Sequence, residues 1–287
     1  MPSSRFVDRL IQRTSDVGSP VCVGLDPVVG KLPEELRTKF GTDVEAVEAF
    51  CLGVIEASAG VAAAFKPQSA CFERLGAPGF AAMGRVIAHA RKLGVPVVLD
   101  AKRGDIGISA AHYAEAVRAL GADAVTVNAY LGPSTVMPYL EAELGVFVLV
   151  RTSNPDSDEV QSARLGTGER VAERMAGLVR TLGSSYITPT GLSDAGAVVG
   201  LTKSADGERL RELMPEQVFL VPGYGAQGGG ASDLVPLLSS KTDLPGRGVL
   251  VNASRSVIYP EARAGESWQD AVARSAEAMH ADLASVL

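Results

Sequence analysis

Charged residues of alternating sign follow two of the apolar segments in the first half of the chain. Lys66 follows one of them, and Asp100, Lys102 and Asp105 follow another. Asp100 and Lys102 are two residues apart, so on one β-strand their side chains leave the same face. A lysine beside carboxylates keeps its proton, because the negative charges favour the ammonium form. Such a lysine suits the stabilisation and protonation of a carbanion, whereas a Schiff-base lysine needs a lowered pKa. The alternative is a structural ion-pair network.

A second group of residues, near the C-terminus, could bind phosphate. Residues 222–228 read Pro-Gly-Tyr-Gly-Ala-Gln-Gly, and a glycine-rich turn presents backbone N–H groups to an anion. Arg255 can grip a phosphate through two parallel hydrogen bonds. The glycines also match a dinucleotide fingerprint, but the motif opens no βαβ unit with an acidic residue after the next strand. Tight turns alone would explain the glycines but not Gln227 or Arg255. We therefore expect a phosphate site built from these two segments.

Short apolar, β-branched runs alternate with segments of helical spacing along the whole length. Continuous apolar runs are typical of parallel strands covered on both faces. Eight alternations predict an α/β fold, most simply a single-domain (β/α)8 TIM barrel, with an open doubly wound sheet as the structural alternative. The expected strands are Val21–Leu25, Val61–Phe65, Val95–Leu99, Ala124–Val127, Val146–Val150, Ala197–Leu201, Val218–Val221 and Gly248–Val251. The expected helices are Val44–Ala59, Phe80–Leu93, Ser109–Leu120, Gly168–Leu182 and Ala262–Val286.

The barrel expectation tells where functional side chains should gather. Active sites of such barrels lie at the C-terminal ends of the strands. Asp26, Lys66, Asp100 and Arg255 all stand at or just after such ends, as does Ser153 after the fifth strand. The interval between the fifth and sixth strands is long, so we expect one domain over residues 1–287 with an insertion at about residues 153–196.

Composition narrows the range of partners and compartments. The formal net charge is −6, which argues against a nucleic-acid or anionic-membrane binder, because both need a cationic surface. No run is long enough to cross a membrane, and the N-terminus lacks the apolar core of a signal peptide. The three cysteines, Cys22, Cys51 and Cys71, are widely spaced and favour free thiols in a reducing compartment. We expect a cytoplasmic protein.

The charged motif and the glycine loop together resemble one enzyme family. Residues 100–106, Asp-Ala-Lys-Arg-Gly-Asp-Ile, are similar to the DxKxxDI signature of orotidine 5′-phosphate decarboxylases. Lys66, the Pro-Gly-Tyr-Gly-Ala-Gln stretch from residue 222, Asp26 and Arg255 match that family in order and position. The likeness runs from about Val21 to Ile258, and the overall length resembles the longer bacterial subfamily, type 2.

The resemblance implies decarboxylation of orotidine 5′-monophosphate (OMP) to uridine 5′-monophosphate (UMP), the last step of de novo UMP synthesis, with no metal or organic cofactor. It implies that Lys102 protonates C6 of the pyrimidine while Asp100 faces the departing carboxylate. It also implies a homodimer in which Asp105 reaches the neighbouring subunit's site. The other residues with implied roles are Asp26 and Lys66 on the ribose, Ile106 and Ser109 from the neighbouring subunit, Ser153 on the base, and Pro222, Gly225, Gln227, Ser254 and Arg255 around the phosphate.

Two positions depart from the family pattern. Many members have glycine where this chain has Ser254, but the backbone N–H survives that change, so we expect phosphate binding to persist. The segment after Ser153 is hard to align, and Thr152 and Asn154 compete with Ser153 for the base contact.

Two other functions remain open. One is a metal-dependent sister barrel, a sugar-phosphate aldolase or keto-acid sugar-phosphate decarboxylase, although an ammonium at Lys66 would oppose a metal there. The other is a non-catalytic nucleotide-binding barrel.

Overall fold

Eight parallel strands form one sheet in the computed structural model, which describes residues 5–225, 228–239 and 244–287. Their order around the sheet is β2-β1-β8-β7-β6-β5-β4-β3. Single bridges from Phe65 to Val97 and from Gln68 to Asp100 join the two outer strands, so the sheet closes into a barrel. The predicted barrel is confirmed. The strands are β1 (Val21–Leu25), β2 (Ala64–Pro67), β3 (Val98–Arg103), β4 (Ala124–Val127), β5 (Gly145–Arg151), β6 (Ser193–Val199), β7 (Gln217–Pro222) and β8 (Val249–Ala253).

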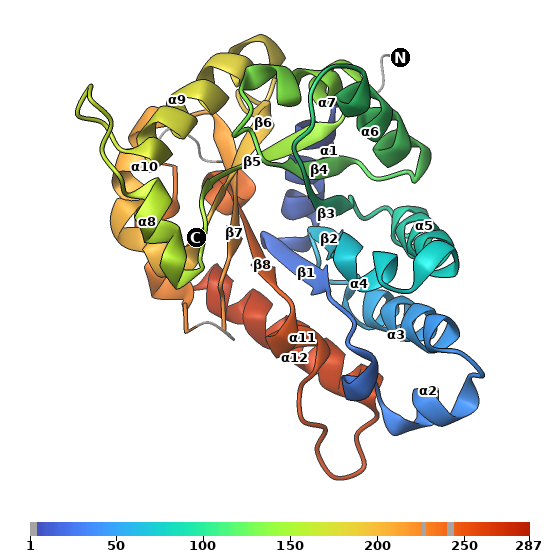
Figure 1. The fold of residues 1–287 in the computed structure, drawn as a ribbon. Helices are drawn as coiled ribbons and strands as arrows, with labels where there is room; N and C mark the ends of the chain where they lie inside the picture. Colours follow the sequence, from blue (N-terminus) through green and yellow to red (C-terminus); the bar gives the residue numbers. More distant parts are fainter. Residues whose placement is uncertain (1–4, 226–227, 240–243) are drawn as a thin grey trace.

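Helices surround the strands on the outside of the barrel (Figure 1). Their inner faces and the outer face of the sheet share one continuous core of buried side chains, as expected where parallel strands are covered by helices. The helices are α1 (Phe6–Val17), α2 (Glu34–Lys39), α3 (Asp43–Ser58), α4 (Ser69–Glu73), α5 (Gly76–Lys92), α6 (Gly107–Ala119), α7 (Met137–Glu141), α8 (Asp158–Gln161), α9 (Val171–Gly183), α10 (Gly207–Leu213), α11 (Arg255–Ile258) and α12 (Trp268–Ala284).

Local sequence signals start the longer helices. Thr42 accepts a hydrogen bond from the backbone N–H of Glu45, whose side chain accepts from the backbone of Thr42, and this capping box begins α3. Ser267 caps α12 by accepting from the backbone N–H of Asp270 at 3.1 Å. These caps satisfy backbone donors that would otherwise lack partners at the first turn.

The first helix closes the N-terminal end of the barrel. Phe6, Val7, Leu10 and Ile11 of α1 are buried and form one cluster with the side chains inside the barrel. Gly145, at the start of β5, allows this approach, because a Cβ there would lie 2.1 Å from the ring of Phe6. Charged residues interrupt this segment in the sequence, and the analysis of apolar runs did not predict a helix there.

Several strands extend beyond the expected apolar runs toward the mouth. β3 continues through Arg103, so Asp100 and Lys102 belong to the strand rather than following it. β6 is instead shifted the other way. It spans Ser193–Val199, so the expected run Ala197–Leu201 is wrong at its end, and Leu201, Thr202 and Lys203 fall in a short 3-10 helix, Leu201–Asp206. The segment between β5 and β6 holds α8 and α9, and its assignment as an insertion stays a prediction. No helix among the described residues is long and apolar enough to cross a lipid bilayer.

Candidate active site

Asp100 is the centre of a hydrogen-bonded cluster in the barrel mouth. Its Oδ2 accepts from the ammonium of Lys66 at 2.8 Å and from Nε2 of Gln68 at 3.1 Å. Its Oδ1 accepts from the ammonium of Lys102 at 2.6 Å and from the hydroxyl of Thr126 at 2.9 Å. Lys66 and Asp100 are buried, whereas the side chain of Lys102 is 49% exposed. Of the two ammonium groups, that of Lys102 therefore has access to the solvent side of the mouth.

The charges in this cluster hold one another ionised. Burial opposes the ammonium form of Lys66, but Asp100 and Asp26 outweigh it and raise the pKa of Lys66 above its usual value. Burial likewise opposes the carboxylate of Asp100, but Lys66 and Lys102 hold its pKa well below its usual range. The cluster thus places two ammonium groups around one carboxylate. A buried ion pair of this kind persists only when its hydrogen bonds are well satisfied, as those of Asp100 are.

The backbone of β3 is irregular where it carries these groups. Leu99 pairs with Val125, and Arg103 pairs with Val127. Between these two pairs β3 advances by four residues and β4 by only two. Lys102 has a φ of +45°, in the left-handed region that few non-glycine residues adopt. Its backbone N–H donates to the hydroxyl of Thr126 at 2.9 Å. Thr126 therefore ties both the backbone of the bulged segment and the carboxylate of Asp100 to β4.

The loops after β5, β6 and β8 meet at a second part of the mouth. They line a pocket of about 530 Å³ in which Ser153 and Arg255, predicted to contact base and phosphate, lie together. Thr202 donates to the carbonyl of Ser153 at 3.1 Å, which ties the β5 and β6 loops to each other. The full lining is Ser153, Asn154, Pro155, Thr202, Lys203 and Arg255.

The glycine loop after β7 lies against the loop after β8. Gly223 and Gly225 have φ values of +106° and +70°, which glycine adopts without strain. A Cβ at Gly225 would lie 2.8 Å from Oγ of Ser256, next to Arg255. Pro222 pairs with Asn252 at the ends of the two strands. Gln227, the predicted phosphate ligand, lies outside the described residues.

Three predicted residues stand apart from the cluster. Oδ1 of Asp105 accepts from the backbone N–H of Ile106 at 2.8 Å, and no contact with Asp100 or Lys102 is present among the described residues. Ile106 is 53% exposed, and Ser109 lies half-buried in the first turn of α6. None of the three is hydrogen-bonded or ion-paired to the cluster among the described residues.

Two residues of the cluster, Gln68 and Thr126, were not among the predicted site residues. Thr126 lies inside an apolar run, where a β-branched residue is typical of the core. Gln68 follows Lys66 by two residues, the same spacing that relates Asp100 to Lys102, and this spacing could have identified it.

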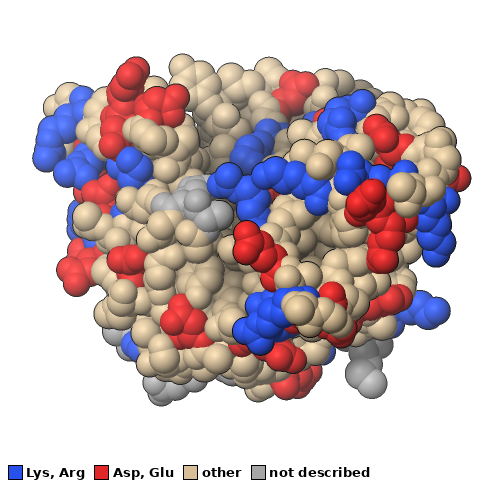
Figure 2. Space-filling view, turned by 90° about the horizontal axis from the view of Figure 1, so that it is seen from below, with Lys and Arg blue, Asp and Glu red and all other residues tan. Residues whose placement is uncertain are grey.

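Seen from below the view of Figure 1, the surface is hollowed near its centre, and Lys and Arg side chains line much of the hollow (Figure 2).

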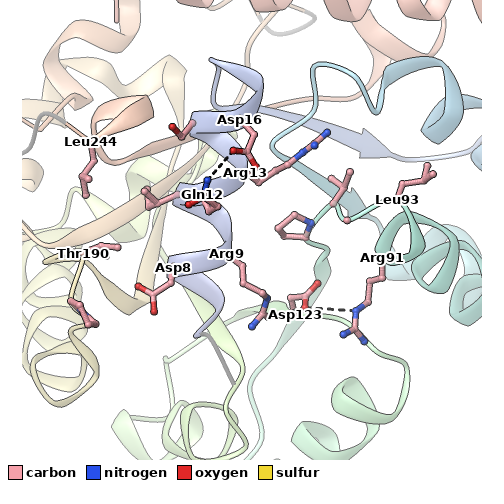
Figure 3. Close-up of a pocket in the computed structure, with 16 residues that line it drawn as sticks. Asp8, Arg9, Gln12, Arg13, Asp16, Arg91, Leu93, Asp123, Thr190 and Leu244 are labelled. Atoms are coloured by element: carbon pink, nitrogen blue, oxygen red, sulfur yellow. Dashed lines mark hydrogen bonds and ion pairs between the residues drawn. The ribbon is translucent and has the colours of Figure 1, made fainter. Parts of the chain in front are cut away.

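Another pocket, of about 930 Å³, lies at the opposite end of the barrel, around α1. There Arg9 and Arg91 approach Asp123 from two sides, at 2.8 and 3.8 Å, and Gln12 donates to Asp16 at 2.8 Å (Figure 3). The two arginines join α1 and α5 to Asp123, far from the strand ends that carry the cluster. We therefore place the active site at the mouth.

Known proteins are similar to this chain along most of its length. The family model described as "Orotidine 5'-phosphate decarboxylase / HUMPS family" matches residues 19–267. A curated orotidine 5′-phosphate decarboxylase of Deinococcus radiodurans is 43% identical, over 88% of this chain and 89% of its own length. That of Rhodopirellula baltica is 38% identical, over 93% and 95%. The solved OMP decarboxylase of Leishmania donovani superposes with a TM-score of 0.79 at 31% identity, covering 99% of this chain and 98% of its own. This chain belongs to the orotidine 5′-phosphate decarboxylase family.

Proposed function

We propose that Lys102 is the proton donor in the reaction of this family, which this protein catalyses: decarboxylation of OMP to UMP and CO2. The observation that carries this assignment is the single carboxylate of Asp100 bound to two ammonium groups, at 2.8 and 2.6 Å. When the bond between C6 and the carboxylate breaks, CO2 leaves and the electron pair stays on C6. A preorganised ammonium beside that carbon stabilises the charge without reorganisation of solvent.

Proton transfer completes the reaction. Nζ of Lys102 gives its proton to C6, and the resulting amine recovers a proton from water, which its half-exposed side chain can reach. Asp100 holds the ammonium in place and faces the departing carboxylate, so their repulsion is relieved as CO2 forms. Lys66 is buried and bound to the other carboxylate oxygen of Asp100, so it fixes that carboxylate in place.

The remaining residues bind the nucleotide. Arg255 and Ser153 line one pocket, which supports a phosphate contact for Arg255 and a base contact for Ser153. The phosphate is remote from C6, so its binding energy can serve to orient the reacting ring. Asp26 stands close enough to Lys66 to raise its pKa, which supports a role at the ribose beside Lys66. Pro222, Gly225, Gln227 and Ser254 complete the proposed phosphate site.

The proposed active unit is a homodimer. Asp105, Ile106 and Ser109 are outside their own cluster, and exposed apolar side chains surround them on the chain. Large apolar side chains in such exposure are typical of protein interfaces. The exposed apolar residues of this region are Ile106, Ile108, Tyr113, Tyr130 and Leu131.

A mixing experiment tests the shared site. Asp105→Asn and Lys102→Ala proteins are each expected to be inactive. After subunit exchange, the mixture should regain part of the activity, because one site of each mixed dimer receives both native residues. Exchange demonstrated by mass spectrometry without any regained activity would contradict a site shared between subunits.

The reaction itself is tested by ultraviolet absorbance. Purified protein incubated with OMP and EDTA should lower the absorbance as OMP becomes UMP, because the proposed chemistry uses only side chains of the protein. Loss of turnover in EDTA with recovery in Mg²⁺ would instead favour a metal-dependent reaction. UMP binding without turnover would favour a non-catalytic barrel.

The proposed location is the cytoplasm. The cysteines Cys22, Cys51 and Cys71 are all free thiols, which supports a reducing compartment. Fractionation of cells that express the tagged protein should place it with cytoplasmic markers.

A further inference from the structure

Asn252 places an amide inside the barrel mouth. Leu250, two residues earlier on β8, belongs to the cluster of side chains inside the barrel, so the alternation of the strand turns Asn252 inward as well. Asn252 is one layer nearer the mouth and only 7% exposed. It lies opposite Cys22 of β1 and Pro222 of β7. The fold, rather than a local turn, therefore directs this side chain toward the site.

Gly24 of β1 provides the space into which this side chain extends. A Cβ at Gly24 would lie 3.1 Å from Oδ1 of Asn252 and 2.0 Å from Oγ of Ser254. Gly24 pairs with Lys66, so this space adjoins the charged cluster. Two polar side chains of β8 thus lean across β1 at the position where any residue other than glycine would clash.

Two buried oxygen acceptors at this seam have no hydrogen-bond partner among the described residues. One is Oδ1 of Asn252, and the other is Oδ1 of Asp26. Asp26 lies two residues after Gly24, on the same side of the chain. A buried acceptor without a donor costs about 1–3 kcal/mol, and a ligand in the mouth that brings two donors can satisfy both of these acceptors, because they adjoin the charged cluster.

We propose that Asn252 is a substrate-binding residue, whose Oδ1 accepts a hydrogen bond from one of the two ribose hydroxyls while Asp26 accepts from the other. Oδ1 of Asn252 lies at the position of Gly24, and Asp26 is two residues further along the chain, about 6.6 Å in an extended segment. Two neighbouring hydroxyls, each donating over about 2.8 Å, bridge acceptors at about that separation. The uracil ring offers a single N–H donor and would leave one acceptor unpaired. This assignment rests on the proposed placement of the nucleotide in the mouth.

The test compares three ligands by calorimetry: UMP, 2′-deoxy-UMP and 3′-deoxy-UMP. Asn252→Ala should lower the affinity for UMP about tenfold, the usual effect of one lost hydrogen bond in a buried site. It should lower the affinity for one deoxynucleotide by the same factor. The affinity for the other should stay unchanged, because that ligand already lacks the hydroxyl that Asn252 holds. Asn252→Asp retains an acceptor oxygen, so it should keep the wild-type ratio between UMP and the deoxynucleotides even if all affinities fall.

Gln217 supplies the matched control. It is a fully buried amide at the start of β7 whose Oε1 and Nε2 also lack partners among the described residues, but it lies at the N-terminal end of the barrel. Gln217→Ala should alter the melting temperature without changing any of the three affinities. A change in ligand ratio there would show that Asn252→Ala acts through the barrel as a whole, and would overturn the assignment.

Two other results would also overturn it. Equal weakening of all three ligands by Asn252→Ala would place the contact on the base or phosphate, and unchanged affinities would show that Oδ1 does not contact the nucleotide. Turnover of OMP by the wild-type protein is measured on the same preparation. If the wild-type protein does not turn over OMP, the proposed function is contradicted. The ratios of the ligand affinities test the role of Asn252 independently of that result.

Discussion

The two ends of the barrel bury charge in different ways. At the mouth, the side chain of Asp100 binds the side chains of Lys66, Lys102, Gln68 and Thr126. At the N-terminal end, the buried charges bind backbone groups as well. Arg211 donates to the carbonyls of four residues in separate segments, which are Leu237, Met214, Gln217 and Gly248.

Two aspartates at the N-terminal end combine an ion pair with a backbone contact. Asp123 pairs with Arg9 at 2.8 Å, and Asp194 pairs with Arg5 at 3.5 Å. Asp194 accepts from the backbone N–H of Val7 at 2.9 Å, and Asp123 accepts from that of Val97 at 2.9 Å. A charge that binds backbone groups fastens chain segments together, while charges that bind one another in an open mouth are available to a ligand. Burial and ion pairing alone therefore do not distinguish a reactive cluster from a structural one. The difference lies in the backbone contacts that the structural charges make, whereas the partners of Asp100 named above are all side chains.

The largest expected effect is at Lys102. Lys102→Ala should lower kcat by at least about a thousandfold, because it removes both the charge beside C6 and the proton donor. UMP affinity and melting temperature should change little, since the side chain is 49% exposed. Single-turnover rates measure the loss of catalysis, and calorimetry with UMP measures the affinity. Retained kcat would place the proton donor elsewhere and weaken the contrast between the two ends.

The matching change at the other end is Arg211→Met. It should lower the free energy of unfolding by about 3 kcal/mol, because buried carbonyls lose their donor. The guanidinium also lies 3.5 Å from the ring centre of Phe219, a contact that methionine only partly replaces. Urea unfolding measures the loss, and kcat of the folded protein should stay within about twofold, given the distance from the mouth. A kcat loss without a stability loss would reverse the comparison.

Arg255→Ala tests the phosphate pocket at the mouth. It should raise KM for OMP about a hundredfold by removing a charge-assisted contact, while uridine affinity stays unchanged. Arg263→Ala, in the exposed loop before α12, is the control and should change neither. Equal losses for UMP and uridine would contradict a phosphate contact.

The smallest effect concerns pH at Asp194. Burial raises the pKa of Asp194 to about 6, although the N–H of Val7 and the charge of Arg5 partly offset it. The folded protein therefore holds this proton more tightly than the unfolded chain, and stability falls as pH rises from about 4 to 6. Asp194→Asn removes this titration and keeps an acceptor for Val7. Its unfolding free energy should gain about 2 kcal/mol relative to wild type between pH 4 and 7 in denaturant titrations. A constant difference would show that Asp194 does not titrate there.

The apolar runs predicted the strands because burial on both faces leaves a continuous signal. Strand ends were less predictable, since β3 carries Asp100 and Lys102 beyond its apolar part. The apolar runs did not predict helix α1, because charged residues lie between its buried residues. Its buried positions Phe6, Leu10 and Thr14 nevertheless recur every four residues, the spacing of an amphipathic helix.

Within the site, residue type and spacing identified Lys66, Asp100 and Lys102, whose side chains the structure brings together. Thr126 could not be identified in this way, because its role depends on which residue of β3 it faces. That register shifts at a bulge, and no local sequence pattern marks it. The binding and catalytic roles of all the site residues stay predictions. Those of Asp105, Gln227 and Ser109 depend in addition on a second subunit or on residues outside those described.

The bulge in β3 also limits how this chemistry could be transferred to another barrel. A designer who copied only the side chains of Asp100 and Lys102 onto a regular strand would keep their spacing but lose the left-handed turn at Lys102. The ammonium would then start from a different backbone position and direction. The smallest portable unit is therefore β3 from Val98 to Arg103 together with Thr126 on the next strand, grafted as one piece of backbone.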